Sequence, residues 1–137
     1  MARGRVLIVD DDPLFREGLR TILEDDLEVV GEAADGGEAV SMVTDGGVDL
    51  VVMDVSMPRL GGLDATRALV AHDPAVLVVI LTGTDDDCEN EAIAAGARAY
   101  LRKSSGLGGL ASLLVGLASV APPAAGTTDE GPVSCRG

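Results

Sequence analysis

Five polar side chains stand directly after short apolar runs, at positions far apart in the chain: Asp10, Asp11, Asp54, Thr82 and Lys103. Several of these runs are continuous rather than alternating, which is typical of strands covered on both faces in a parallel sheet. The carboxyl ends of such strands lie at one edge of the sheet. We therefore expect the five side chains to converge in one crevice at that edge.

This set of side chains suits phosphoryl transfer. Three neighbouring carboxylates repel one another, and a hard divalent cation such as Mg²⁺ relieves the repulsion. Lys103 adds a compact positive charge, and the Thr82 hydroxyl can donate to a phosphoryl oxygen. Positive charge and donors around one carboxylate stabilise a phosphoryl group in transit. The pattern predicts Asp54 as a nucleophile that forms an acyl phosphate, with Asp10 and Asp11 beside it at a Mg²⁺ site.

Strand-like runs alternate with segments of helical spacing, which predicts an α/β domain with a doubly wound parallel sheet. Five strands and five helices favour the flavodoxin-like strand order 2-1-3-4-5. The runs expected to form strands are residues 6–9, 28–31, 50–53, 76–81 and 99–101.

The first helix should begin at Asp12 as N-cap, with Pro13 at its first position. A fourth helix should begin within the acidic residues 85–87 and end at Gly96. A fifth is expected from about 105 to 120. The first helix should bury one apolar face, formed by Phe15, Leu19, Ile22 and Leu23.

Residues 1–120 are expected to form one domain, and residues 121–137 a flexible linker or tail, because that segment is rich in Pro, Gly, Ala and Thr. The formal net charge of −13 and the presence of only two aromatic residues argue against direct nucleic-acid binding. Two widely separated cysteines and the lack of a membrane-length apolar stretch favour a soluble cytoplasmic protein.

Four segments carry a resemblance to a known family. They are VDDDPLFREGL at residues 9–19, MDVSMP at 53–58 followed by Gly61 and Gly62, LT at 81–82, and YLRK at 100–103. Together and in this order, they resemble the receiver domain of NarL/LuxR-type response regulators over roughly residues 4–120. The resemblance implies the CheY-like form of the fold and a two-component system in which a sensor histidine kinase phosphorylates Asp54.

The resemblance also implies roles for matching positions at the metal site. Asp11 and Asp54 would bind Mg²⁺ directly, Asp10 would act largely through water, and the backbone carbonyl of Ser56 would be a further ligand. Such a domain is regulatory and catalyses only its own phosphorylation and dephosphorylation.

Two further implied roles concern what phosphorylation changes. Thr82 and Lys103 would contact the phosphoryl group, and Thr82 with Tyr100 would form a switch. Movement of that pair would remodel the face made by the fourth helix, the fifth strand and the fifth helix. Tyr100 as an ordinary core residue is the competing interpretation.

Two departures leave further alternatives open. Asp12 stands where this class commonly has His, and it is either an N-cap or an added negative charge at the metal site. Residues 107–120 contain no charged residue. One stripe of that helix should cover the sheet, and the rest is either a homodimer or partner contact or a tolerated set of small residues. The stripe is formed by Leu110, Leu113, Leu114 and Leu117.

Other functions are also compatible with parts of this pattern. Asp10 to Asp12 fit the D-x-D pattern of haloacid-dehalogenase-type phosphatases, in which Asp10 would be the nucleophile. A phosphorylation-independent interaction module is a second alternative. The chain is either the receiver portion of a longer transcription factor with a helix-turn-helix domain or a stand-alone receiver. We expect no phosphorelay or metal role for His72. We expect Cys88 to be a small residue of the fourth helix rather than a redox sensor.

Overall fold

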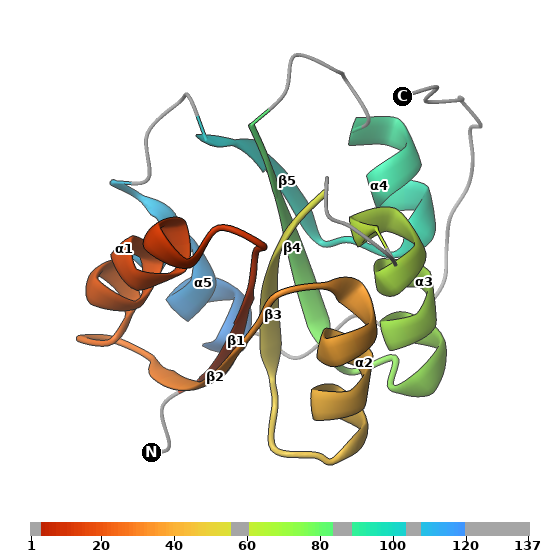
Figure 1. Ribbon diagram of the computed structural model, residues 1–137, viewed down its shortest axis with the longest axis horizontal. Helices are drawn as coiled ribbons and strands as arrows, with labels where there is room; N and C mark the ends of the chain where they lie inside the picture. The colour runs from red at the N-terminus through yellow and green to blue at the C-terminus, as the bar shows by residue number, and fades with distance from the viewer. Residues whose placement is uncertain (1–3, 56–60, 84–88, 104–107, 120–137) are drawn as a thin grey trace.

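The computed structural model describes residues 4–55, 61–83, 89–103 and 108–119 (Figure 1). In chain order, the elements are β1 (Arg5–Val9), α1 (Pro13–Leu23), β2 (Glu28–Ala33), α2 (Gly36–Thr44), β3 (Leu50–Asp54), α3 (Gly62–His72), β4 (Leu77–Thr82), α4 (Glu89–Ala95), β5 (Ala99–Arg102) and α5 (Leu110–Ser119). The five strands pair in parallel in the order β2-β1-β3-β4-β5, which confirms the predicted topology.

Helices cover both faces of the sheet, with α1 and α5 on one side and α2, α3 and α4 on the other (Figure 1). Side chains alternate between the two faces along each strand. In β1, Val6 and Ile8 point toward α1 and α5, whereas Leu7 and Val9 point toward the other three helices. This double covering explains why β1, β3 and β4 are continuous apolar runs.

Helix α1 begins as predicted. The Asp12 side chain accepts a hydrogen bond from the Leu14 N–H, and Pro13 occupies the first turn. The predicted apolar face is only partly correct, because Leu19 and Leu23 are buried whereas Ile22 is 38% exposed. The buried stripe of α1 is therefore narrower than its apolar stripe.

The predicted end of α4 is correct, whereas the predicted start of α5 is wrong. Helix α4 ends at Ala95 and is followed by Gly96 at a φ of 116°, as expected for a C-terminal glycine. Helix α5 begins at Leu110, and Gly108 and Gly109 form a turn before it, so the expected start near 105 was wrong. Two adjacent glycines disfavour helix, because each costs about 1 kcal/mol relative to alanine.

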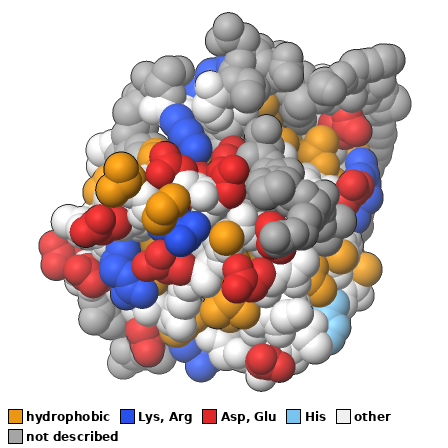
Figure 2. Space-filling view, viewed as in Figure 1, with side chains coloured by type: hydrophobic (Ala, Val, Ile, Leu, Met, Phe, Trp, Pro, Cys, Tyr) orange, Lys and Arg blue, Asp and Glu red, His pale blue; other side chains and the backbone are white. Residues whose placement is uncertain are grey.

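None of the helices within the described ranges is long and apolar enough to cross a membrane. Figure 2 shows acidic side chains over much of the visible face, with both signs of charge gathered over α1. The expected start of α4 at 85–87 and the expected tail at 121–137 lie outside the described residues.

Candidate metal centre

The carboxyl edge of the sheet brings together the side chains that the sequence pattern singled out. Asp54 is the last residue of β3, and Thr82 is the last residue of β4. Asp10 directly follows β1, and its N–H still donates to the Ala33 carbonyl of β2 at 3.0 Å. Lys103 directly follows β5. The parallel register therefore places all four at one edge, as predicted.

Three carboxylates meet at this edge. Asp10, Asp11 and Asp54 each offer an oxygen atom, and these atoms lie within 4.8 Å of one another. Asp10 and Asp54 are buried and Asp11 is exposed. Carboxylate oxygens at such distances, reachable by water from one side, are the ligands that Mg²⁺ or Ca²⁺ takes in proteins. The donor set therefore fits a hard divalent cation.

Lys103 partly neutralises this cluster. Its Nζ lies 2.8 Å from Asp10 Oδ2 and 3.6 Å from Asp54 Oδ2. Burial by itself lowers the pKa of Lys103, but the hydrogen bond to Asp10 and the charge of Asp54 outweigh it, so the net pKa is raised above its usual value. The ammonium group also lies 4.0 Å from the centre of the Phe15 ring, a favourable cation–π position. Lys103 is therefore held as a cation at the site.

The Asp10 carboxylate has partners on both of its oxygens. Oδ2 accepts from Lys103, and Oδ1 accepts from the Asp12 N–H at 2.8 Å. The Asp12 side chain is turned the other way, onto the Leu14 N–H at 3.0 Å. This confirms the N-cap interpretation of Asp12.

Thr82 and Tyr100 occupy neighbouring strands. Thr82 is buried and directly follows Leu81, the residue that pairs with Asp54 across β3 and β4. Tyr100 pairs with Ile80, is half-buried and packs against the core on the α2–α4 side. Thr82 therefore lies at the edge that carries Asp54. Tyr100 lies on β5, the strand next to that of Thr82. Ser56 and Cys88 lie outside the described residues.

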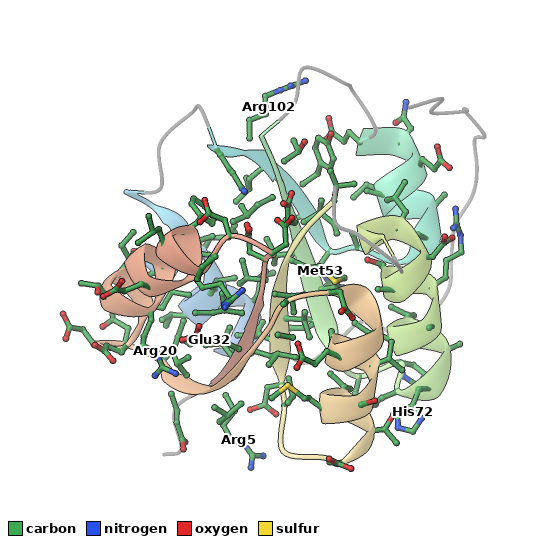
Figure 3. All side chains as sticks on the ribbon, in the orientation of Figure 1. Arg5, Arg20, Glu32, Met53, His72 and Arg102 are labelled. Carbon is green, nitrogen blue, oxygen red and sulfur yellow. The ribbon has the colours of Figure 1, made fainter. Side chains whose placement is uncertain are left out.

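One contact to Asp10 was not predicted. Arg16 of α1 donates from its guanidinium to the Asp10 backbone carbonyl. The same guanidinium donates to Glu32 of β2 through Nε at 2.9 Å. The sequence does carry one signal that Arg16 and Arg20 share a partner. Their spacing of four residues places both side chains on one face of α1. His72 is exposed at the end of α3, as Figure 3 shows.

Comparisons with known proteins agree with this geometry. The family model described as the response regulator receiver domain matches residues 6–114. The response regulator UvrY of Escherichia coli K12 is 44% identical over 103 residues, which cover 73% of this chain and 47% of UvrY. The response regulator GacA of Pseudomonas viridiflava is 42% identical over 106 residues, covering 75% of this chain and 50% of GacA. The chain thus spans about half the length of these curated relatives.

Solved structures give the same result. A two-component response regulator of the LuxR family from Aurantimonas sp. SI85-9A1 superposes with a TM-score of 0.80 at 36% identity, covering 86% of both chains. The signal receiver domain of NarL from Mycobacterium tuberculosis also reaches 0.80, at 28% identity, over 87% of this chain and 98% of its own. The chain therefore belongs to the family of response regulator receiver domains, alongside two-component regulators of the NarL and LuxR type.

Proposed function

We propose that this domain accepts a phosphoryl group on Asp54 with Mg²⁺ bound at Asp10, Asp11 and Asp54. The observation that carries the proposal is the meeting of three carboxylates and Lys103 at one edge of the sheet. A purely structural domain has no reason to bury two carboxylates of like charge side by side, because each loses hydration and repels the other.

The reaction transfers a phosphoryl group from nitrogen or oxygen to oxygen. A carboxylate oxygen of Asp54 forms a bond to phosphorus as the bond from phosphorus to the donor breaks, and the donor leaves with the bonding electrons. In a phosphohistidine donor, the leaving imidazole nitrogen then takes a proton. The cation supplies charge neutralisation between the carboxylates and the phosphoryl oxygens, and Lys103 and the Thr82 hydroxyl contribute on the protein side.

We further propose a sensor histidine kinase as the phosphoryl donor, since two-component regulators receive their phosphoryl groups from such kinases. The backbone carbonyl of Ser56 is proposed as an additional metal ligand. Thr82 and Tyr100 are proposed to carry the change from the site to the surface formed by α4, β5 and α5.

The proposed output is based on a relative of known role. DegU of Brevibacillus brevis, which is 39% identical over 102 residues, is a transcriptional regulatory protein. By this likeness, we propose transcription regulation through a DNA-binding region beyond this domain, with a stand-alone receiver as the alternative. Helix α5 carries no charge and leaves Val115 37% exposed, so we propose it as the contact between two copies.

The test is phosphorylation by acetyl phosphate in the presence and absence of Mg²⁺, followed by intact-mass spectrometry. The wild-type chain should gain one phosphoryl group only with Mg²⁺, and Asp54→Asn should gain none. Borohydride reduction of the acyl phosphate followed by peptide mapping should place the modification at residue 54.

The same experiment distinguishes the proposed function from the phosphatase alternative, which the family match does not support. A modification that persists in Asp54→Asn and disappears in Asp10→Asn would identify Asp10 as the nucleophile. A wild-type chain that takes no phosphoryl group and binds no Mg²⁺ would favour the phosphorylation-independent interaction module.

A further inference from the structure

The guanidinium of Arg16 connects the candidate metal centre to the edge strand of the sheet. One nitrogen donates to the Asp10 carbonyl and Nε donates to Glu32 Oε1 at 2.9 Å. The Arg16 side chain is only 17% exposed and that of Glu32 29%. A planar guanidinium held at two points in a partly buried setting has one orientation, unlike a solvated surface arginine.

Glu32 faces Arg16 because of an irregularity in β2. Val6 pairs with Val29 and Leu7 pairs with Gly31, so Val30 is one extra residue opposite β1. After this bulge, Glu32 pairs with Ile8, whose side chain points toward α1. Without the extra residue Glu32 would pair with Val9 and point to the opposite face, where it would meet α2.

The Glu32 carboxylate is bound by two arginines of α1. Arg20 Nε lies 3.0 Å from Oε2, and Arg16 Nε takes Oε1 (Figure 3 shows Arg20 beside Glu32). The hydrogen bonds from Arg20 and Arg16 lower the pKa of Glu32 below its usual value, so the carboxylate stays ionised at a lower pH than a free glutamate does. Glu32 is thus a fixed anchor for Arg16.

The carbonyl that Arg16 binds belongs to the peptide joining Asp10 to Asp11. The N–H of Asp10 is already fixed on Ala33, and its carboxylate is fixed by Lys103 and the Asp12 N–H. The hydrogen bond from Arg16 also fixes the orientation of the Asp10–Asp11 peptide. That orientation determines where the exposed Asp11 carboxylate lies relative to Asp10. Arg16 therefore acts on the geometry of the carboxylates without contributing an oxygen to them.

We propose that Arg16, anchored by Glu32, is a positioning residue that sets the Asp10–Asp11 peptide so that three carboxylates converge on one cation. This inference rests on the proposed function of the site. Electrostatics alone gives the opposite expectation, because removing a positive charge near a cation site strengthens cation binding. The sign of the change in Mg²⁺ affinity therefore distinguishes positioning from simple charge repulsion.

The experiment measures Mg²⁺ affinity of the full chain by isothermal titration calorimetry for wild type, Arg16→Met and Arg20→Met. Arg20 lies one turn further along α1 and also binds Glu32, and no hydrogen bond from it to Asp10 is seen among the described residues, so it is the matched control. Arg16→Met should weaken Mg²⁺ binding about tenfold, as expected for loss of a group that orients metal ligands. Arg20→Met should stay within about twofold of wild type.

A second measurement follows phosphorylation by acetyl phosphate over a range of Mg²⁺ concentrations. In Arg16→Met, the Mg²⁺ concentration for half-maximal rate should rise about tenfold while the rate at saturating Mg²⁺ stays near the wild-type value. A general loss of stability would not produce that separation. Glu32→Gln should weaken Mg²⁺ binding in the same direction, and adding it to Arg16→Met should cause little further loss because both act on the same peptide.

The outcomes separate this inference from the function on which it rests. If wild type binds Mg²⁺ and is phosphorylated, but Arg16→Met matches Arg20→Met or binds Mg²⁺ more tightly, the positioning role is refuted and the phosphoacceptor function stands. If wild type shows neither Mg²⁺ binding nor phosphorylation, the proposed function fails and the positioning role fails with it.

Discussion

Strands β1 and β3 carry charged residues at both of their ends, and the two ends are built differently. At the amino end, Arg5 of β1 meets Asp49, which directly precedes β3, with Nε 3.5 Å from Oδ2 and both side chains 47% exposed. At the carboxyl end, Asp10 and Asp54 are like charges with side chains only 2% and 9% exposed. Lys103, which directly follows β5, binds both of them. Figure 3 labels Arg5 at the amino end of the sheet.

The two ends differ in burial, and burial separates the charges of the candidate site from ordinary surface charges. An exposed pair of opposite charges forms wherever two such residues are neighbours, and it contributes little to stability. Buried like charges are unfavourable for folding unless a cation or a proton neutralises them, and Lys103 supplies positive charge here. Burial combined with charge repulsion, rather than the number of charged residues, therefore distinguishes the candidate site in a chain with a net charge of −13.

Replacing Lys103 with Met should cause the largest loss of phosphorylation and of stability. Met keeps an unbranched apolar side chain over Phe15 but leaves Asp10 and Asp54 without their shared cation. Phosphorylation by acetyl phosphate should fall about a hundredfold, as expected for loss of one charged transition-state contact. In EDTA, the free energy of unfolding in urea should fall by about 3 kcal/mol.

Mg²⁺ provides the control for that variant. It should stabilise Lys103→Met more than wild type, because the cation then relieves a repulsion that Lys103 no longer relieves. Unchanged stability in EDTA together with a normal phosphorylation rate would show that the carboxyl end behaves like the exposed pair at the amino end.

The convergence of the site could be predicted, whereas its internal contacts could not. Continuous apolar runs before Asp54 and Thr82 specify buried parallel strands, and parallel strands place their carboxyl ends together. The closer approach of Lys103 to Asp10 than to Asp54 depends on side-chain packing over Phe15, which residue spacing does not encode. The bond from Arg16 depends on the bulge at Val30.

Gly31 is a weak sign of the bulge, because a glycine inside a strand often marks one. Val29 and Val30 are both apolar, however, so the run otherwise looks like an unbroken strand. The exposure of Ile22 was missed for a related reason. Helical periodicity defines an apolar stripe, but the width of the buried part depends on how closely the neighbouring helix and sheet approach.

Replacing Gly62 with Ala should have an intermediate effect at the carboxyl end. A Cβ atom at Gly62 would overlap the Asp54 carbonyl oxygen and lie 2.7 Å from Val55 Cα, both backbone atoms. Either α3 or the end of β3 must move, so the free energy of unfolding should fall by about 2 kcal/mol, measured by urea denaturation. The phosphorylation rate should also fall, because the displaced peptide carries Asp54.

Gly18→Ala in α1 is the matched control for this substitution. A Cβ atom there meets nothing within 4 Å, so alanine should stabilise the chain by up to about 1 kcal/mol. If Gly62→Ala also stabilises the chain and leaves phosphorylation unchanged, the close approach of α3 to Asp54 is not required.

Replacing Arg5 with Gln should have the smallest effect, and it tests the amino end directly. The Asp49 carboxylate keeps its hydrogen bond from the Arg5 backbone N–H at 3.0 Å, which any residue at position 5 except proline can donate. The ion pair itself is long and exposed to solvent, so its loss should change the free energy of unfolding by less than about 0.5 kcal/mol in 0.15 M salt. Phosphorylation of Asp54 should be unchanged, because the substitution lies at the opposite end of β1. A loss comparable to that of Lys103→Met would mean that charge alone, rather than burial, decides what each end contributes.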